Sequence, residues 1–331
     1  MAYTTIDNPE LYFQTKLYTG TGSSNSITLD GSENMQPDWV WIKRRNGTNW
    51  HTLYDSVRGT TKVLNSNEDE PESTDSTGLT SFDSDGFTHG SGGNGNIDGG
   101  SFVAWNWKKT AAAGFDIVSF TGSGSARTIS HSLSAVPKFY LVKNRSTDNL
   151  SWRTYHTSIG ATKFMALEHT YAEASASSVF NNTEPTSSVF SVGTDDGANK
   201  NGDNLICYLF SEVKGYSKFG SYTGNGNADG TFVYTGFKPA WILLKASNNA
   251  SWNWRLSDST RTTFNSSTHH NLFPSSNDAE VSNEKDLDYL SNGFKLRTSG
   301  SGVNASGYEM IYMAFAESPF VNSNGVPNNA R

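Results

Sequence analysis

Residues 222–230 read Tyr-Thr-Gly-Asn-Gly-Asn-Ala-Asp-Gly, a short segment in which three glycines follow an aromatic residue. Glycine clusters are typical of phosphate-binding loops, in which the pattern Gly-x-Gly-x-x-Gly opens a helix whose N-terminus faces the phosphate. The third glycine of this segment, Gly230, comes one residue too late for that pattern. The sequence also lacks a long amphipathic helical pattern. The segment therefore predicts a turn between strands, and its recurrence decides the fold.

The same arrangement of an aromatic residue, a threonine and two glycines occurs three times, and successive copies lie 102 residues apart. The copies are Tyr18-Thr19-Gly20-Thr21-Gly22, Phe120-Thr121-Gly122-Ser123-Gly124 and Tyr222-Thr223-Gly224-Asn225-Gly226. Glycine allows the tight backbone with which an aromatic strand reverses into the next strand. We therefore expect the three glycine pairs to lie in equivalent turns.

Four further landmarks follow each copy of this turn in a constant order. They are a proline with an apolar run that ends in lysine, a strand that begins at a tryptophan, a Ser-(Asp/Asn)-Gly-Phe turn that is degenerate in the second copy, and a last apolar strand. The apolar runs end at Lys43, Lys143 and Lys245, and the tryptophan strands are 50–55, 152–156 and 254–258. Five landmarks in one order predict a triplicated unit.

The predicted organisation is three tandem units, residues 10–113, 114–214 and 215–320, each of about 100 residues. Residues 1–9 are a candidate N-terminal attachment segment, and residues 321–331 form a C-terminal tail. The joints between the units are short, so we expect the units to touch. One hypothesis is that the three units mimic a trimer and present a pseudo-threefold surface.

Composition and turn signals predict an all-β chain. Aromatic residues make up 13% of it although hydrophobic residues make up only 35%, which indicates thin cores built on aromatic side chains. The apolar runs are rich in β-branched and aromatic residues, and Asp85-Gly86 and Asn292-Gly293 are hairpin dipeptides. Each unit is predicted to be a β-sandwich of the jelly-roll or lectin-like type. The best helix candidate, residues 161–175, also fits a strand.

Charge and cysteine content narrow the classes of partner. The formal net charge is −7, which argues against nucleic acid as a partner. The single cysteine, Cys207, excludes an internal disulfide framework and is expected to be a buried, inert thiol. The N-terminus has no signal-peptide pattern, and no apolar stretch is long enough for a membrane span, so we expect no membrane insertion.

No catalytic, metal or cofactor motif stands out, and we predict that the chain is not an enzyme. A carboxylate pair for glycoside hydrolysis remains an alternative, because acidic residues are plentiful. The acidic stretch 67–75 is predicted to be a solvated loop, with a calcium site as the alternative. His269 and His270 are predicted to lie in a surface loop and not in a metal site.

Two sets of residues are candidates for ion pairs and for ligand binding. The candidate ion pairs, Asp55 with Arg58 and Asp258 with Arg261, recur in the first and third copies, where they fix a loop or contact another subunit or a ligand. Tryptophans that flank polar loops are candidate platforms for sugar rings, the alternative being packing. They are Trp50, Trp152, Trp252 and Trp254.

The whole chain resembles a family of virion proteins from tailed phages, especially phages of marine cyanobacteria and other marine bacteria. The resemblance rests on strings such as Pro37-Asp-Trp-Val-Trp-Ile-Lys43, Leu53-Tyr-Asp-Ser-Val-Arg-Gly59 and the closing Gly325-Val-Pro-Asn-Asn-Ala-Arg331. Members of that family are labelled as structural or tail-fibre-like proteins, without catalytic residues. The resemblance implies a place in the virion, assembled in the host cytoplasm.

Three functions remain open at the level of the sequence. The first is a tail or appendage protein that attaches to a host-surface glycan. The second is a capsid decoration or tail structural protein without a ligand, and the third is a glycan-degrading tail enzyme. The expected partners are other virion proteins, a host glycan and, as an alternative, further copies of the chain.

Overall fold

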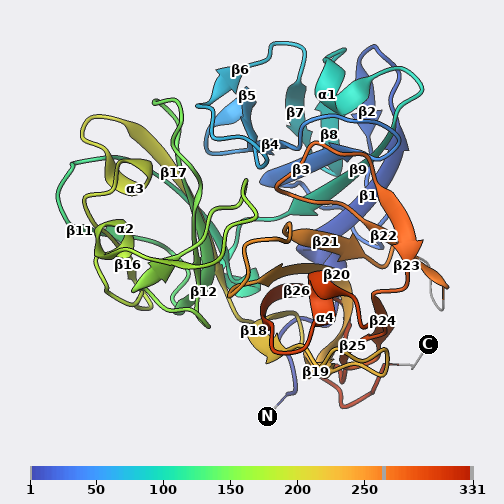
Figure 1. Ribbon diagram of the computed structural model, residues 1–331. Helices are drawn as coiled ribbons and strands as arrows, with labels where there is room; N and C mark the ends of the chain where they lie inside the picture. Colours follow the sequence, from blue (N-terminus) through green and yellow to red (C-terminus); the bar gives the residue numbers. More distant parts are fainter. Residues whose placement is uncertain (1, 263–265, 329–331) are drawn as a thin grey trace.

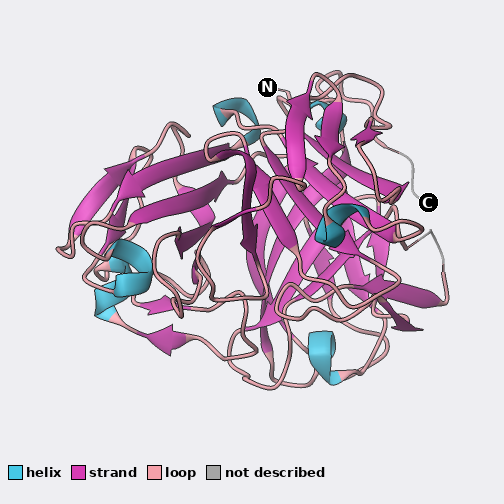
Figure 2. Cartoon of the chain, turned by 90° about the horizontal axis from the view of Figure 1, so that it is seen from above, coloured by secondary structure: helices cyan, strands magenta, loops and turns pink. Residues whose placement is uncertain are grey.

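The structure, a computed structural model, describes residues 2–262 and 266–328. Antiparallel strands dominate these residues, and the helices within them are single turns of three or four residues, as Figure 2 shows. The all-β prediction is therefore confirmed. Residues 161–175 are not helical: they contain β14 (Lys163–Phe164) and β15 (Ala174–Ser175), joined by irregular chain.

The strands form three sets of sheets, which we call unit 1, unit 2 and unit 3 after the predicted ranges 10–113, 114–214 and 215–320. The sets surround a common centre in Figure 1. Unit 1 contains η1 Pro9–Leu11, β1 Phe13–Thr19, β2 Asn25–Ile27, β3 Trp39–Arg44, β4 Thr52–Asp55, β5 Gly59–Asn65, β6 Ser73–Thr74, β7 Leu79–Asp83, β8 Gly86–His89, α1 Gly93–Asn96, β9 Ser101–Trp107 and η2 Ala111–Ala113.

The other two units hold the remaining elements. Unit 2 contains β10 Phe115–Thr121, β11 Arg127–Ser130, β12 Pro137–Asn144, β13 Arg153–His156, β14, β15, α2 Ser177–Phe180, β16 Val189–Val192, α3 Asp196–Asn199 and β17 Asn204–Ser211. Unit 3 contains β18 Ser217–Thr223, β19 Phe232–Tyr234, β20 Phe237–Ala246, β21 Arg255–Asp258, β22 Thr268–Asn271, β23 Val281–Glu284, β24 Leu287–Leu290, β25 Gly293–Leu296, α4 Ser301–Asn304 and β26 Glu309–Pro319.

One strand order occurs three times. The main sheets run β1-β9-β3-β4, β10-β17-β12-β13 and β18-β26-β20-β21, and in unit 1 the sheet continues through β5 and β6. Smaller sheets begin with the pairs β2-β8, β11-β16 and β19-β25. The repeated order supports the predicted triplication. The unit boundaries and the jelly-roll classification stay predictions.

The main sheets are buried on both faces, which explains why their strands are continuous apolar runs. In β3, Trp39 and Trp41 belong to a core that all three units share, whereas Val40 and Ile42 belong to a second core inside unit 1. In the shared core, equivalent residues of β9, β17 and β26, the last strand of each unit, are in contact. The rings of Trp107, Phe210 and Phe315 meet edge to face, with centroids 5.8 to 6.5 Å apart.

The predicted glycine turns have the same geometry in the three units. The second glycine of each pair has positive φ, at 64° for Gly22, 66° for Gly124 and 65° for Gly226. A Cβ on the first glycine would lie 2.1, 1.9 or 2.2 Å from a carbonyl oxygen, for Gly20, Gly122 and Gly224 respectively. Only glycine fits either position without strain.

A buried asparagine holds each of these turns, and sequence reasoning missed all three. Asn304, at the end of α4, donates from Nδ2 to the carbonyls of Asn227 and Thr298 at 2.8 Å each, and its Oδ1 accepts the Asn225 N–H at 3.1 Å. Asn96 in α1 and Asn199 in α3 make the equivalent bonds. The signal was present in the sequence as Asn-x-x-Gly at 96–99, 199–202 and 304–307.

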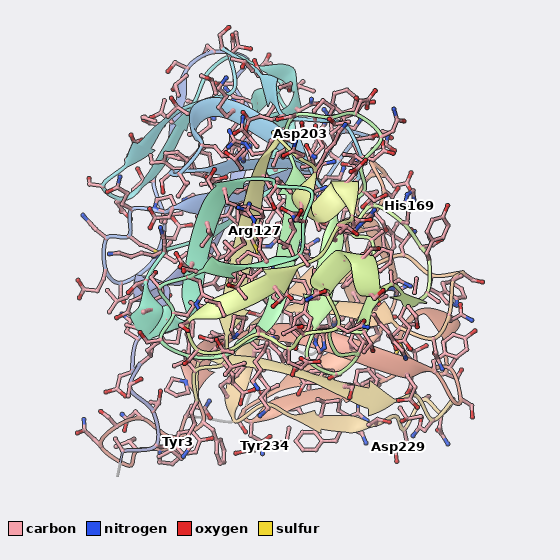
Figure 3. All side chains as sticks on the ribbon, turned by 90° about the vertical axis from the view of Figure 1, so that its left-hand side faces the viewer. Tyr3, Arg127, His169, Asp203, Asp229 and Tyr234 are labelled. Atoms are coloured by element: carbon pink, nitrogen blue, oxygen red, sulfur yellow. The ribbon has the colours of Figure 1, made fainter. Side chains whose placement is uncertain are left out.

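The predicted attachment segment packs against unit 2, unit 3 and the core that the units share. Thr4 and Ile6 are buried, and the Thr4 hydroxyl donates to the Lys214 carbonyl at 2.8 Å. Tyr3 and Tyr234 lie beside each other in Figure 3, and their hydroxyls are 3.1 Å apart. Residues 3–7 are therefore not a free arm, because Ile6 is buried in the shared core and Tyr3 contacts unit 3.

The C-terminal tail also folds back on the molecule. Its Ser323 N–H donates to Asp7 at 2.7 Å, and Asn328 donates to the Ser291 carbonyl at 2.9 Å. The last predicted tail residues, 329–331, lie outside the described residues.

Candidate functional site

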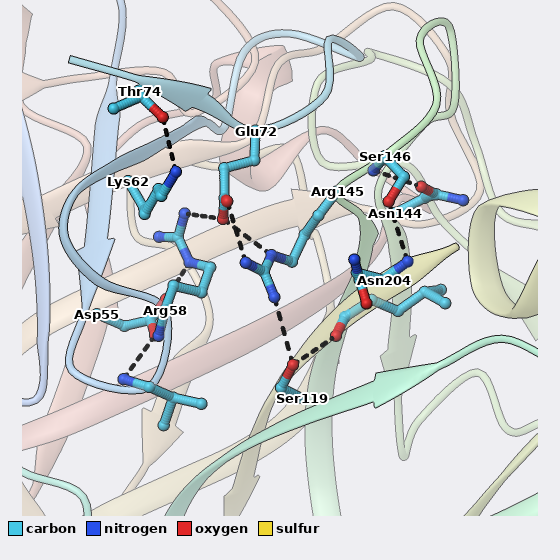
Figure 4. A network of polar contacts seen from close by, with 12 residues as sticks. Asp55, Arg58, Lys62, Glu72, Thr74, Ser119, Asn144, Arg145, Ser146 and Asn204 are labelled. Carbon is cyan, nitrogen blue, oxygen red and sulfur yellow. Dashed lines mark hydrogen bonds and ion pairs between the residues drawn. The ribbon is translucent and has the colours of Figure 1, made fainter. Parts of the chain in front are cut away.

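The border between unit 1 and unit 2 is built on a buried chain of alternating charges, shown in Figure 4. Asp55, at the end of β4, pairs with Arg58, and both side chains are 0% exposed. The Arg58 guanidinium reaches Glu72 at 3.3 Å, and Glu72 pairs with Arg145 of unit 2 at 2.8 Å. The Tyr208 hydroxyl of unit 2 donates to Asp55 at 2.7 Å. The predicted ion pair thus fixes its own loop and also contacts the next unit.

The border between unit 3 and unit 1 repeats this chain. Asp258 pairs with Arg261 at 2.6 Å, again with both side chains 0% exposed. Arg261 reaches Glu280 at 3.0 Å, and Glu280 pairs with Arg45 of unit 1 at 2.8 Å. The indole N–H of Trp105 in unit 1 donates to Asp258 at 3.0 Å.

The border between unit 2 and unit 3 has no equivalent chain among the residues at the matching positions. Strand pairing places His156 opposite Phe139, as Asp55 lies opposite Trp39. His156 is 1% exposed, and its Nε2 lies 3.0 Å from the Tyr312 carbonyl while its Nδ1 accepts the Ser158 N–H. The neutral ring is therefore fully paired, and burial lowers the pKa of His156 to about 4.

One equivalent lysine crosses each of the three borders. Lys43 donates to a carbonyl of unit 3 at 3.1 Å, Lys143 to a carbonyl of unit 1 at 2.7 Å and Lys245 to a carbonyl of unit 2 at 2.9 Å. Burial lowers the pKa of each to about 8. The direction is the same at every border: each unit reaches the one before it, and unit 1 reaches unit 3. The contacts therefore form a closed ring.

Two of the four tryptophans predicted as sugar platforms are enclosed in these borders. Trp152 and Trp254 are 0% and 1% exposed, and their indole N–H groups donate to the carbonyls of Asn65 and Ala166 in the preceding unit at 3.0 and 2.9 Å. No ring face is left for a sugar, so these two residues pack and do not bind. Seven of the nine tryptophans are buried, which leaves Trp50 and Trp252 accessible.

Trp252 lines a hollow of about 280 Å³ in unit 3. Arg255 and Asp286 form an ion pair in its wall, and Asn271 donates from Nδ2 to the same Asp286 oxygen at 2.7 Å. That bond orients the amide, and its Oδ1 is buried without a hydrogen-bond partner among the described residues. The full lining is Trp252, Arg255, Asn271, Phe273, Val281, Asp286, Thr298, Gly300, Gly302 and Val303.

A comparison with unit 2 explains why this hollow is open. Arg153, the equivalent of Arg255, is held by both oxygens of Asp195 at 2.8 and 3.0 Å, and Phe164 lies 5.0 Å from its guanidinium. Asp195 caps α3, and in unit 3 the cap of α4 is Gly300, which has no side chain. Phe164 is matched in register by Asn271. Phe273 instead lies over the Arg255 guanidinium, 5.6 Å from it to the ring centroid, so the missing side chain at Gly300 accounts for the space beside Arg255.

Trp50 lines a second hollow of about 170 Å³ at the border of unit 1 and unit 3, together with Thr48, Asn49, Asn94 and Asn277. Its side chain is 46% exposed. The predicted tryptophan strands place Trp50 and Trp152 at equivalent positions. In the structure Asp55 is equivalent to His156, so the residue equivalent to Trp152 is His51. Trp50 is therefore one residue further out and faces solvent, whereas His51 is buried.

The remaining candidates form no site of their own. The described residues contain no group of three or more His, Cys, Asp or Glu side chains that could hold a metal ion. His269 and His270 lie on β22 and not in a loop, and His269 is 1% exposed and stacks on Tyr289. Cys207 is buried, and burial raises the pKa of its thiol. No helix of the described chain has the length and apolar character to cross a bilayer.

Comparisons with known proteins identify a family without an assigned function. A family model described as "Domain of unknown function (DUF7483)" matches residues 8–319, and the chain belongs to this family. Curated proteins give no match. A solved structure described as "Crystal Structure of the STIV MCP" is similar over 61% of this chain and 97% of that chain, with 10% identity and a TM-score of 0.22. A likeness of that strength carries no argument about function.

Proposed function

We propose that this member of the DUF7483 family is a non-enzymatic phage virion protein that binds a host-surface glycan in the Trp252 hollow. The observation that carries the proposal is the pairing of an accessible indole with oriented polar groups in one hollow. Sugars have an apolar ring face that packs on aromatic rings and hydroxyls that donate hydrogen bonds. Trp252 offers the first kind of contact, and the lining residues Asp286 and Thr298 offer polar groups for the second.

The carboxylate content of the hollow favours binding over cleavage. Glycoside hydrolysis ordinarily uses two carboxylates on opposite sides of the bond. Asp286 is the one carboxylate among the described lining residues, and Arg255 and Asn271 both engage it. In the proposed function, Asp286 serves to recognise sugar hydroxyls. The role in the virion is supported by the resemblance of the whole sequence to tailed-phage structural proteins.

A glycan array probed with the full chain tests the binding. Trp252→Ala is expected to weaken binding about tenfold or more, because it removes the ring on which the sugar packs. Trp252→Phe keeps an aromatic face and is expected to restore part of the affinity. Tyr171→Ala is the matched control, since Tyr171 is 60% exposed and lies outside the hollow. Equal binding by wild type and Trp252→Ala would contradict the proposal.

A structural protein without a ligand is the second candidate, and the closed ring of border contacts favours it. Three similar units that each contact the next form a surface suited to a threefold axis of a particle. Immunogold labelling and cryo-EM of virions separate the two candidates. Copies on threefold axes together with an inactive array favour the structural role, and copies on tail appendages favour attachment.

A further inference from the structure

We infer that the Trp50 hollow is a second sugar subsite, so that the ligand is an extended, neutral oligosaccharide which crosses from unit 3 to unit 1. This inference rests on the proposed function, since it takes the Trp252 hollow as the first subsite. It starts from the fact that one segment, 273–281, lines both hollows. Phe273 and Val281 line the first, and Asn277 lines the second.

The two subsites are close along this segment. Phe273 and Asn277 are four residues apart, which is at most about 14 Å of extended chain. The turn at Phe273, whose carbonyl accepts the Ser276 N–H at 2.8 Å, shortens that span. A short oligosaccharide bridges such a distance, and a single sugar does not.

The segment is fixed against unit 1 before any ligand arrives. The Ser66 hydroxyl donates to the Pro274 carbonyl at 2.8 Å, and the Asn277 carbonyl accepts both Lys43 at 3.1 Å and the Asn49 N–H at 3.0 Å. A preformed site avoids the entropy of ordering a loop on binding. The two hollows therefore keep a constant relation, as subsites for one chain require.

The chemistry of the Trp50 hollow selects a neutral sugar. Its lining side chains are one indole, three amides and one hydroxyl, and Asn49 donates to Asn94 Oδ1 at 2.9 Å. Two cations outside the lining contact lining residues: Lys43 donates to the Asn277 carbonyl at 3.1 Å, and Arg44 donates to the Asn49 Oδ1 at 3.3 Å. Amides pair with hydroxyls in both directions, as donors and as acceptors. A carboxylated or sulfated residue would find no cation among the lining side chains.

The test measures how affinity depends on ligand length. Probes are printed series of gluco-, manno- and galacto-oligosaccharides from one to six residues, with the full chain as analyte. For the series that binds, wild type is expected to bind the hexasaccharide about tenfold or more tighter than the monosaccharide. Trp50→Ala is expected to abolish that gain. Trp50→Phe is expected to restore most of the gain.

The outcomes separate this inference from the proposed function. Binding without a length gain, or a gain that Trp50→Ala retains, overturns the second subsite and leaves the Trp252 site standing. Binding confined to acidic glycans overturns the neutral assignment. Absence of any binding by wild type rejects both. Because Trp50 is exposed, the alanine variant is expected to fold, and an unchanged melting temperature verifies this.

Discussion

The border between unit 2 and unit 3 differs from the other two in the groups that it buries. Two borders place an aspartate and an arginine out of solvent and give the aspartate a hydrogen bond from Tyr208 or Trp105 of the neighbouring unit. The third has neutral His156 instead, paired with a backbone carbonyl. Strand register shows that Met313, which cannot donate, replaces the donor. The acceptor in one unit and its donor in the neighbouring unit therefore differ together at this border.

The largest expected effect comes from breaking a charged border. Asp258→Asn keeps the shape of the side chain but leaves the buried Arg261 with Glu280 in place of two carboxylates, and the cost is expected to be about 3 kcal/mol. Urea unfolding measures it. His156→Gln, the matched change at the neutral border, should cost clearly less. Equal losses of stability in the two variants would contradict the idea that the buried charges make the charged border more sensitive than the neutral one.

Converting the neutral border into a charged one sharpens the comparison. His156→Asp alone buries an unpaired carboxylate and is expected to cost about 3 kcal/mol. Ile159 occupies the position of Arg58 and Arg261, three residues after the acceptor. Adding Ile159→Arg and Met313→Tyr is expected to recover more than half of the loss, because the three groups act as one network. Additive losses on urea unfolding would contradict the equivalence of the borders.

Acid is expected to weaken the neutral border first. The pKa of His156 is about 4 in the folded chain, below the ordinary value near 6.5, so the unfolded chain binds more protons between these values. Stability contributed by this group is therefore present above pH 6.5 and lost as the pH falls towards 4, by up to about 3 kcal/mol. The difference between wild type and His156→Gln across this range isolates the effect from the other histidines. A constant difference would contradict it.

The glycine turns are expected to give the smallest effect and to show what the units still share. Gly22→Ala, Gly124→Ala and Gly226→Ala each force a side chain into positive φ, at a cost of about 1 kcal/mol. Thermal melting of the three variants should give equal shifts within error. Unequal shifts would show that the turns have diverged in stability although their backbones agree.

The repeated strands could be predicted from the sequence because they depend on local pattern. The glycine pairs, the apolar runs and the final strands carry their signal within a few residues, and the strand order repeats with them. The unit borders could not be predicted, because their partners lie far apart along the chain: Tyr208 and Asp55 are separated by 153 residues. Neither residue carries a local mark of that contact.

The sequence predicted only some of the residues of the candidate site. Exposed and enclosed tryptophans look alike in a sequence, and four were proposed where two are accessible. Accessibility depended on a register difference of one residue between Trp50 and His51 and on the loss of a side chain at Gly300. The absence of a side chain at Gly300 is recognised only when the units are compared in the structure, where Asp195 occupies the equivalent position.

The closed ring of borders has a consequence for how this molecule can change. In an assembly of three identical chains, one mutation alters every border and every pocket at once. A single chain that carries all three units can accept a substitution in one place and preserve the other two. In the part of the chain that the structure describes, the histidine border is found at one of the three borders and the hollow beside Gly300 lies in unit 3. Because the three units are linked in one chain and are not identical copies, each unit can change without the same change in the other two.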